Sequence, residues 1–232
     1  MEITMVEIHE YDEQGLSPEL RQPGEISKGG VVNTASAPTD QNKAVKGAPV
    51  VLSTKRLTLR TPHKRDYDAI VKYANNPNVA RNLGQMPYPY TLDDAAHWAE
   101  VLAKPSVRRQ TFAVTSRFED DFLGGCGYRP CELDEERVVV GYWLGEPFWG
   151  NGIAAEATQA IIDYAFKTED IKAVAATARS SNHQSKRVLE KCGFQFTHSG
   201  MAMSLAVNGM VAIDHYRLNK STWESLHSWG ER

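Results

Sequence analysis

The sequence lacks both paired cysteines and long apolar runs. Its three cysteines, Cys126, Cys131 and Cys192, contain no Cys-x-x-Cys pair, and their odd number does not suit a disulfide framework. No stretch approaches the roughly 18 apolar residues that a membrane-spanning helix needs. Acidic residues near the N-terminus replace the apolar region of a secretory signal. These absences predict a cytoplasmic protein with buried thiols, without a metal site and without membrane association.

A strong excess of charge of one sign is also missing. The 26 Lys and Arg residues nearly balance the 29 Asp and Glu residues, which gives a formal net charge of −3. The basic residues form no long cluster, and this argues against nucleic-acid binding. A hydrophobic content of 41% over 232 residues is sufficient for the core of one ordinary domain. The expected partners are therefore small molecules or a peptide.

Residues 1–50 differ in composition from the rest of the chain. Glycine, proline and small polar residues interrupt them throughout, and eight acidic residues face only four basic ones. Such a composition predicts a mobile N-terminal extension, followed by a folded domain at residues 51–232. Weak alternation at residues 1–8 leaves open an added edge strand.

Hydrophobic periodicity predicts mixed α and β structure after residue 50. Strands are expected at residues 56–60, 111–115, 122–128, 138–144 and 172–178, and in a hairpin of residues 201–207 and 210–218 with a type I′ turn at Asn208-Gly209. Helices are expected at residues 66–75, after an N-cap at Thr91, at 153–167, and from Ser181 or Asn182 to Gly193, with a turn or helix at 223–229.

A glycine loop joins the strand at 138–144 to the helix at 153–167. Gly150 and Gly152 allow a tight turn and a close approach to a ligand, because neither has a Cβ atom. The first amides of the helix have no intrahelical partner and lie at the positive end of its dipole. The loop is therefore a candidate phosphate site, although a tight connection without a ligand has the same pattern.

The same loop matches the dinucleotide-binding pattern Gly-x-Gly-x-x-Ala at residues 150–155. In that motif an acidic residue follows the next strand and binds the ribose. Here Asp170 precedes the next strand, and Arg179 stands after it. A nicotinamide dinucleotide is therefore disfavoured, whereas phosphate recognition of another kind remains open.

Four motifs carry a resemblance to a known family. They are Thr-Lys-Arg-Leu-Thr-Leu-Arg at 54–60, Gly-Tyr-Trp-Leu at 141–144, Phe-Trp-Gly-Asn-Gly-Ile-Ala at 148–154, and Asn-His-Gln-Ser-Lys-Arg-Val-Leu-Glu-Lys-Cys-Gly-Phe at 182–194. With the order of elements, they make the chain resemble the GNAT-superfamily N-acetyltransferases, most closely the RimJ/RimL-like (ribosomal-protein-alanine acetyltransferase-like) branch. The resemblance spans roughly residues 53–225. It implies an α+β fold whose mixed, mostly antiparallel central sheet is splayed in the middle and flanked by helices.

The resemblance also implies acetyl-CoA as the co-substrate, held in the splay, with no metal. It implies that pantetheine lies along Trp143 and Leu144 and that the diphosphate meets the glycine-loop amides. Asn182 would bond the pantetheine arm or the product, and Ser185 would lie near the thioester sulfur, which makes these two residues the catalytic candidates. The implied cofactor-binding residues are Trp143, Leu144, Trp149, Gly150, Asn151, Gly152, Ile153, Ala154, Asn182 and Ser185.

Two positions depart from the family pattern. Leu189 stands where many members place a tyrosine that protonates the leaving thiolate, so Ser185 or a water would have to serve. Val139 stands where related proteins often carry a glutamate base, and Glu135, Glu136 or a water chain would have to replace it.

The acceptor is expected to be a primary amine. An α-amine, with a pKa near 8, is neutral far more often at cytosolic pH than a lysine amine, with a pKa of about 10.4, so without an obvious base we favour a protein N-terminus, a peptide or an amino-acid-like metabolite. The family layout implies an acceptor pocket between residues 86–90, the helix after them and the hairpin around Asn208. The alternatives are a catalytically weak CoA-binding sensor or adaptor and a different nucleotide-binding enzyme, and the chain would be a monomer or homodimer.

Overall fold

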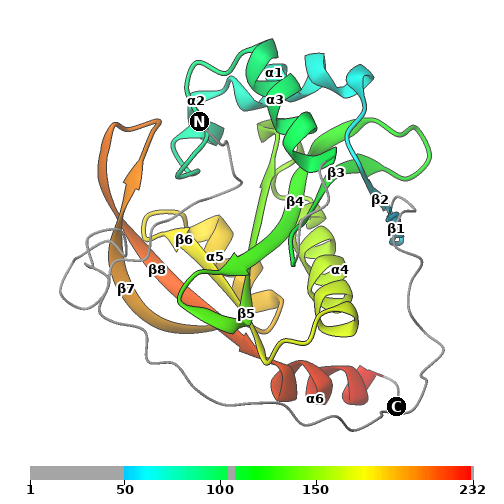
Figure 1. Cartoon of the computed structure of the whole chain (residues 1–232), viewed down its shortest axis with the longest axis vertical. Helices are drawn as coiled ribbons and strands as arrows, with labels where there is room; N and C mark the ends of the chain where they lie inside the picture. The colour runs from blue at the N-terminus through cyan, green and yellow to red at the C-terminus, as the bar shows by residue number, and fades with distance from the viewer. Residues whose placement is uncertain (1–49, 104–107, 231–232) are drawn as a thin grey trace, which may run out of the picture.

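A computed structural model describes residues 50–103 and 108–230 (Figure 1). The extension predicted for residues 1–50, with its alternation at 1–8, lies outside the described residues except for residue 50. Within the described ranges, no helix is long and apolar enough to cross a bilayer. All three cysteines are buried and free.

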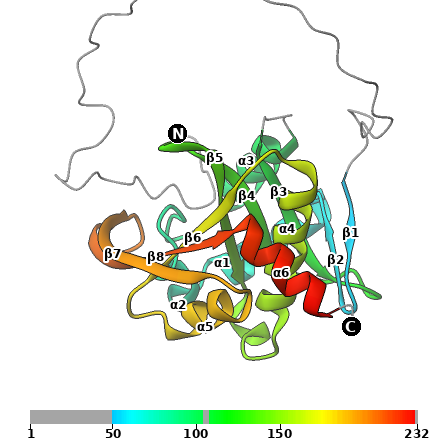
Figure 2. The same ribbon diagram turned by 90° about the horizontal axis from the view of Figure 1, so that it is seen from below.

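An eight-stranded sheet forms the centre of the structure, with β1 at one end and β7 at the other (Figure 2). The strand order is β1-β2-β3-β4-β5-β6-β8-β7. Only β5 and β6 pair in parallel; the other neighbours are antiparallel. The strands are β1 Leu52–Ser53, β2 Leu57–Arg60, β3 Gln110–Ser116, β4 Phe122–Cys131, β5 Asp134–Leu144, β6 Ala173–Arg179, β7 Gln195–Ser204 and β8 Gly209–Asn219.

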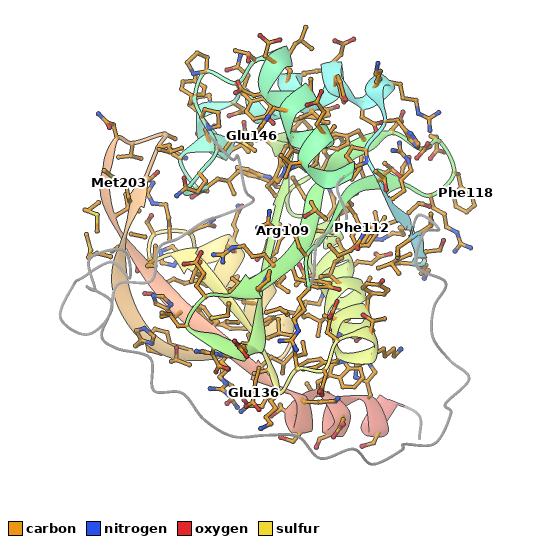
Figure 3. All side chains as sticks on the ribbon, viewed as in Figure 1. Arg109, Phe112, Phe118, Glu136, Glu146 and Met203 are labelled. Carbon is orange, nitrogen blue, oxygen red and sulfur yellow. The ribbon has the colours of Figure 1, made fainter. Side chains whose placement is uncertain are left out.

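Helices cover both faces of this sheet (Figure 1). They are α1 Tyr67–Ala74, α2 Pro77–Ala80, α3 Leu92–Ala103, α4 Ile153–Thr168, α5 His183–Lys191 and α6 Lys220–Gly230. Because strand side chains alternate between faces, β3 contributes Phe112 and Val114 to the core under α4 and Ala113 to the core under α1 and α3. Figure 3 shows Phe112 inside the molecule, whereas Phe118 points outward from the β3–β4 turn.

Several element boundaries in the structure differ from those predicted from the sequence, and one helix was not predicted. Helix α2 was not predicted, although Asn76 caps it by accepting the Asn78 amide at 2.8 Å and Pro77 occupies its first turn. Strand β5 begins at Asp134 rather than 138, because Asp134 pairs with Cys131 at the end of β4. Strand β7 begins at Gln195 rather than 201.

The predicted type I′ turn at Asn208-Gly209 was wrong. Gly209 is the first residue of β8 and pairs with Ser204, so the loop contains four residues, 205–208. Asn208 takes the left-handed conformation alone, with φ of 50°. The asparagine therefore supplies the positive φ that the hairpin requires, but in a longer turn.

The sheet divides between β5 and β6. These strands pair only at Arg137↔Ala173, Val138↔Val174 and Val139↔Ala175. Beyond Val139, β5 continues to Leu144 against β4 alone, and β6 continues to Arg179 against β8 alone. The facing edges of the two strands are thus open where both strands end.

Candidate active site

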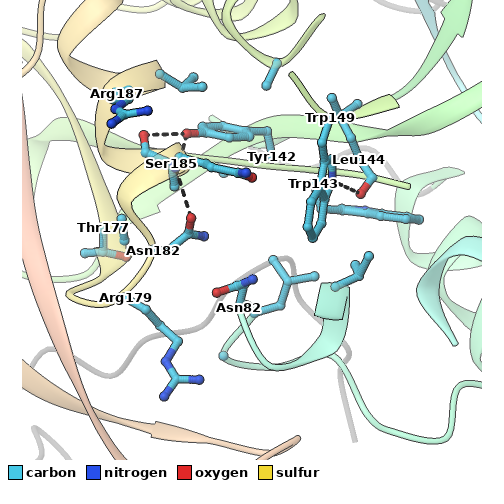
Figure 4. Close-up of a pocket in the computed structure, with 18 of the residues that line it drawn as sticks. Asn82, Tyr142, Trp143, Leu144, Trp149, Thr177, Arg179, Asn182, Ser185 and Arg187 are labelled. Carbon is cyan, nitrogen blue, oxygen red and sulfur yellow. Dashed lines mark hydrogen bonds between the residues drawn. The ribbon is translucent and has the colours of Figure 1, made fainter. Parts of the chain in front are cut away.

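A cavity of about 420 Å³ occupies the opening between β5 and β6 (Figure 4). Its walls come from the two strands, the glycine loop with the start of α4, one side of α5, the end of α2 with the residues after it, and the β7–β8 hairpin. A volume of this size is typical of a site for a small molecule or cofactor. Four separate segments of the chain therefore converge on the cavity, within residues 79–84, 140–155, 177–191 and 202–213.

The glycine loop presents free amides to this cavity. Gly150 and Gly152 have φ of 79° and 75°, a left-handed conformation that glycine adopts without strain. The first backbone bond of α4 runs from the Glu156 N–H to the Gly152 carbonyl, at 3.1 Å. In the part of the chain that the structure describes, the amides of residues 150–155 have no hydrogen-bond acceptor. The loop can therefore bind an anion at the positive end of a 16-residue helix.

Side chains from β2 and α4 hold the loop in place. The Glu156 carboxylate accepts from the Thr54 hydroxyl at 2.6 Å, the Arg56 amide at 2.9 Å and the Arg56 Nε at 2.7 Å. Arg56 Nη1 then donates to the carbonyl of Asn151 at 2.9 Å. Desolvation by burial raises the pKa of Glu156, but the hydrogen bonds from Thr54 and Arg56 outweigh it, so the pKa lies below its ordinary value. We call Thr54, Arg56, Glu156 and Asn151 the loop anchor.

Most of the predicted cofactor residues line the cavity. Trp149 joins the loop to β5, because its Nε1 donates to the Leu144 carbonyl at 2.8 Å. Asn151 does not line the cavity, and its side chain donates instead to the Trp149 carbonyl at 3.2 Å. The predicted residues that do line it are Trp143, Leu144, Trp149, Gly150, Gly152, Ile153, Ala154, Asn182 and Ser185.

A polar cluster stands at the start of α5. Asn182 caps this helix by accepting the Ser185 amide at 3.0 Å. The Ser185 hydroxyl lies 2.8 Å from the phenol oxygen of Tyr142 on β5 (Figure 4). Burial raises the pKa of Tyr142 well above its ordinary value, so the phenol stays protonated. No role was predicted for Tyr142 from the sequence, although it lies within the Gly-Tyr-Trp-Leu motif.

The two positions that depart from the family pattern lie in the core. Leu189 is fully buried, and Val139 packs against Cys131 and Ala175. The substitute bases suggested by sequence do not line the cavity. Glu136 pairs with Lys172 at 2.5 Å, at the opposite end of β5 from Glu146 in Figure 3. Neither Glu135 nor Glu136 is therefore placed to act in the cavity.

The titratable side chains that line the cavity are cationic or neutral. Arg187 and Lys191 come from α5, and Arg179 ends β6 with its Nη1 on the Arg81 carbonyl at 2.6 Å. Among the described lining residues there is no aspartate, glutamate or histidine. The cavity therefore favours anionic ligands.

The acceptor side differs partly from the predicted layout. The hairpin does line the cavity, through residues 202–204 with Val211 and Ile213. Its partner, however, is the segment that includes Val79 and residues 82–84, joined to the hairpin by a bond from the Leu205 amide to the Gly84 carbonyl at 2.8 Å. Residues 86–90 do not line the cavity, because Tyr90 is buried in the core and Tyr88 is exposed.

An ion pair fixes α5 against the sheet. Asp214 on β8 accepts from Ser180 at 2.6 Å and from Ser199 at 2.8 Å, and it pairs with Lys186 of α5. Desolvation opposes its ionisation, but these hydrogen bonds outweigh it and lower the pKa of Asp214 to about 2. The start of α5, which carries Asn182 and Ser185, is thereby held in place.

Comparison with known proteins decides the family. Residues 56–195, more than half of the chain, match the family model described as Acetyltransferase (GNAT) domain. The chain belongs to the GNAT acetyltransferase family. The predicted GNAT fold and the RimJ/RimL-like relationship are confirmed.

Relatives and a solved structure support this membership. The uncharacterized N-acetyltransferase p20 of Bacillus licheniformis is 30% identical over 146 residues, which cover 62% of this chain and 82% of p20. The ribosomal-protein-serine acetyltransferase of Escherichia coli (strain K12) is 30% identical over 76 residues, or 33% of this chain and 42% of the relative. The structure of RimL, a ribosomal L7/L12 alpha-N-protein acetyltransferase in complex with coenzyme A, has a TM-score of 0.64 at 16% identity and covers 73% of this chain and 98% of RimL.

The Asp214 network predicts a pH-dependent contribution to stability. Since the folded-state pKa lies below the ordinary value of 3.8, the contribution is present above about pH 4 and is lost as the pH falls towards 2. Asp214→Asn should lower the free energy of unfolding by about 1–3 kcal/mol at pH 7. Thermal unfolding at pH 7 and pH 2.5 should show the difference shrinking in acid. Asp121→Asn, on the exposed β3–β4 turn, is the control, and an equal difference at both pH values would contradict the assignment.

Proposed function

We propose that the protein transfers the acetyl group of acetyl-CoA to a primary amine, by direct attack of the amine within a ternary complex. The observation that carries this proposal is the loop at residues 150–155, whose amides have no acceptor among the described residues and which borders, except at Asn151, a cavity opened by two diverging strands. Membership of an acetyltransferase family and the coenzyme A bound to RimL support the choice of ligand.

The cavity offers a surface for each part of acetyl-CoA. The diphosphate accepts hydrogen bonds from the loop amides, and the cations Arg187 and Lys191 lie on the neighbouring helix. Pantetheine extends along β5 past Trp143 and Leu144, where the strand edge has no partner on the β6 side. The acetyl group then reaches Asn182 and Ser185, at the start of α5.

The chemistry consists of positioning and of protonation of the leaving group. Holding the amine and the thioester in reacting geometry supplies the larger part of the rate acceleration. General acid catalysis typically adds a further factor of about 10² to 10⁴. Asn182 fixes the first turn of α5, and Ser185 donates a proton towards the departing sulfur. With no carboxylate or histidine among the described lining residues, the amine enters already neutral.

This charge pattern also selects among acceptors. A polyamine or another polycation needs acidic groups to bind, whereas the described lining supplies Arg179, Arg187 and Lys191. Near pH 7.5 a substantial fraction of an α-amine is neutral. A molecule with an α-amine also need not carry a second positive charge. The α-amine of a protein N-terminus, a peptide or an amino-acid-like metabolite is therefore the acceptor we propose.

The missing base also favours one other function. A chain that binds acetyl-CoA in this cavity and transfers nothing would act as a sensor or adaptor. Binding of acetyl-CoA without thiol release across a broad amine panel would establish that function and contradict ours.

Gly152→Asp should abolish tight binding of acetyl-CoA. The new residue must adopt the left-handed φ of 75°, and a Cβ atom there lies 3.6 Å from Arg56 Nη2, so its carboxylate adds negative charge at the anion site and competes for the loop anchor. We expect at least about a tenfold rise in the Kd from calorimetry, equivalent to about 1.4 kcal/mol. Gly209→Asp is the control, since a Cβ there meets no atom within 4 Å. Unchanged affinity in Gly152→Asp would count against the anion site.

Removing the loop anchor should weaken the same ligand less severely. Arg56→Ala loses the bonds to Glu156 and to the Asn151 carbonyl, so the amides lose their fixed orientation. A partly exposed pair is worth about 1 kcal/mol, which corresponds to roughly a fivefold rise in Kd. Arg117→Ala removes a bond to the Thr54 carbonyl on the same turn and should leave Kd unchanged. An equal rise in Kd in both variants would show that Arg56 acts only through the turn that contains Thr54, and not through the glycine loop.

The acceptor preference is tested by thiol release with a panel of amines at pH 7.5. Peptides with a free α-amine and neutral amino acid amides should react at least about tenfold faster in kcat/KM than Nα-acetyl-lysine or spermidine, because of the difference in neutral fraction and the cationic lining. For α-amines the rate should rise with pH, reach half its maximum near pH 8 and level off above about pH 9. Preference for spermidine would contradict this assignment.

A further inference from the structure

Two hydroxyl groups in the cavity, those of Tyr142 and Ser185, form a hydrogen-bonded pair. The Tyr142 phenol oxygen lies 2.8 Å from the Ser185 hydroxyl oxygen and 3.2 Å from the Ser185 carbonyl oxygen. Both residues line the cavity, one from β5 and the other from α5 (Figure 4). The pair therefore bridges the opening beyond Val139, the last residue of β5 that pairs with β6.

The distances allow two directions for this bond. The Ser185 carbonyl belongs to α5, where helical geometry assigns it to the amide four residues later, and it lies farther from the phenol. The phenol can donate to this carbonyl while the Ser185 hydroxyl donates to the phenol oxygen, or it can donate to the nearer hydroxyl oxygen of Ser185. In the second arrangement the hydroxyl proton of Ser185 is free to point into the cavity. Asn182 fixes the residue by accepting its amide at 3.0 Å.

We propose that Tyr142 acts through Ser185 to protonate the leaving thiolate, an inference that rests on the proposed acetyl transfer. The amine nitrogen bonds to the acetyl carbon, and the carbon–sulfur bond breaks with its electron pair on sulfur. Ser185 gives its proton to sulfur as Tyr142 gives its own to the Ser185 oxygen. The proton released by the acceptor nitrogen restores the phenol, so the net transfer is one proton from nitrogen to sulfur.

The environment of Tyr142 keeps a proton on the phenol, and the same burial makes the phenolate a strong base that readily takes up a proton again. Its phenol is protonated throughout the physiological range, since burial raises its pKa. The ring reaches the start of α5 from β5, whereas Leu189 lies one turn further along the helix and is fully buried. Tyr142 thus places a phenol beside Ser185 although the helix itself carries none. Because this phenol is also the proton's destination after attack, the step needs no carboxylate in the cavity.

Kinetics test the inference through coupling between the two residues. Tyr142→Phe keeps the ring and should lower kcat roughly 10- to 100-fold, with KM for acetyl-CoA changed less than about twofold. Ser185→Ala should lower kcat at least as much, and the double variant should be no slower than Ser185→Ala, because both act in one relay. Tyr128→Phe is the control: it loses a bond to Glu169 at 2.7 Å outside the cavity and should keep its rate. Wild-type kcat in Tyr142→Phe, or effects that multiply in the double variant, would overturn the relay.

A binding measurement decides the matter without acetyl transfer. Wild-type protein should bind CoA increasingly better than desulfo-CoA as the pH rises to about 9, because the relay stabilises the thiolate. Tyr142→Phe should reduce that preference at least about threefold and leave the Kd for desulfo-CoA unchanged. An equal loss for both ligands would mean a structural role and reject the inference. Failure of the wild-type protein to acetylate any amine would reject the proposed function, and the binding preference alone would then decide the role of Tyr142.

Discussion

The short pairing of β5 with β6 is the constraint on which the rest of the structure depends. Three residue pairs join these parallel strands before they diverge, and buried backbone groups beyond that point need other partners. Parallel strands also end at the same edge of a sheet, so the segments that follow both strands meet there. The glycine loop with α4 follows β5, and α5 follows β6. One topological feature thus brings two helix N-termini to the same opening.

Separate contacts turn this opening into a fixed site. The loop anchor joins β2 to the first turn of α4 through Arg56 and Glu156. Asp214 joins β8 to α5 through Lys186. Each contact links elements distant in sequence, and neither one lines the cavity. The lining can therefore remain free to bind a ligand, because residues behind it supply the rigidity.

Local signals allowed much of the fold and part of the site to be predicted. The left-handed glycines and the Asn182 cap depend on neighbouring residues, so the sequence showed them. Helix α2 has only four residues, too few for periodicity, and the start of β7 has an exposed pattern that only pairing with β8 defines as a strand. The contact between Tyr142 and Ser185 joins residues 43 positions apart, which spacing does not reveal.

The missing carboxylate and the hydroxyl pair have a common explanation. A neutral amine needs no base to begin its attack, but it becomes positively charged once it has bonded to carbon, and it must then lose a proton. At the same moment the departing sulfur gains negative charge and must receive one. In a cavity whose charged described lining residues are all cationic, a free carboxylate would also compete with the diphosphate for the loop amides. In the proposed relay a neutral phenol and hydroxyl would avoid that conflict, because the net transfer of a proton from nitrogen to sulfur would leave no added charge near the diphosphate site.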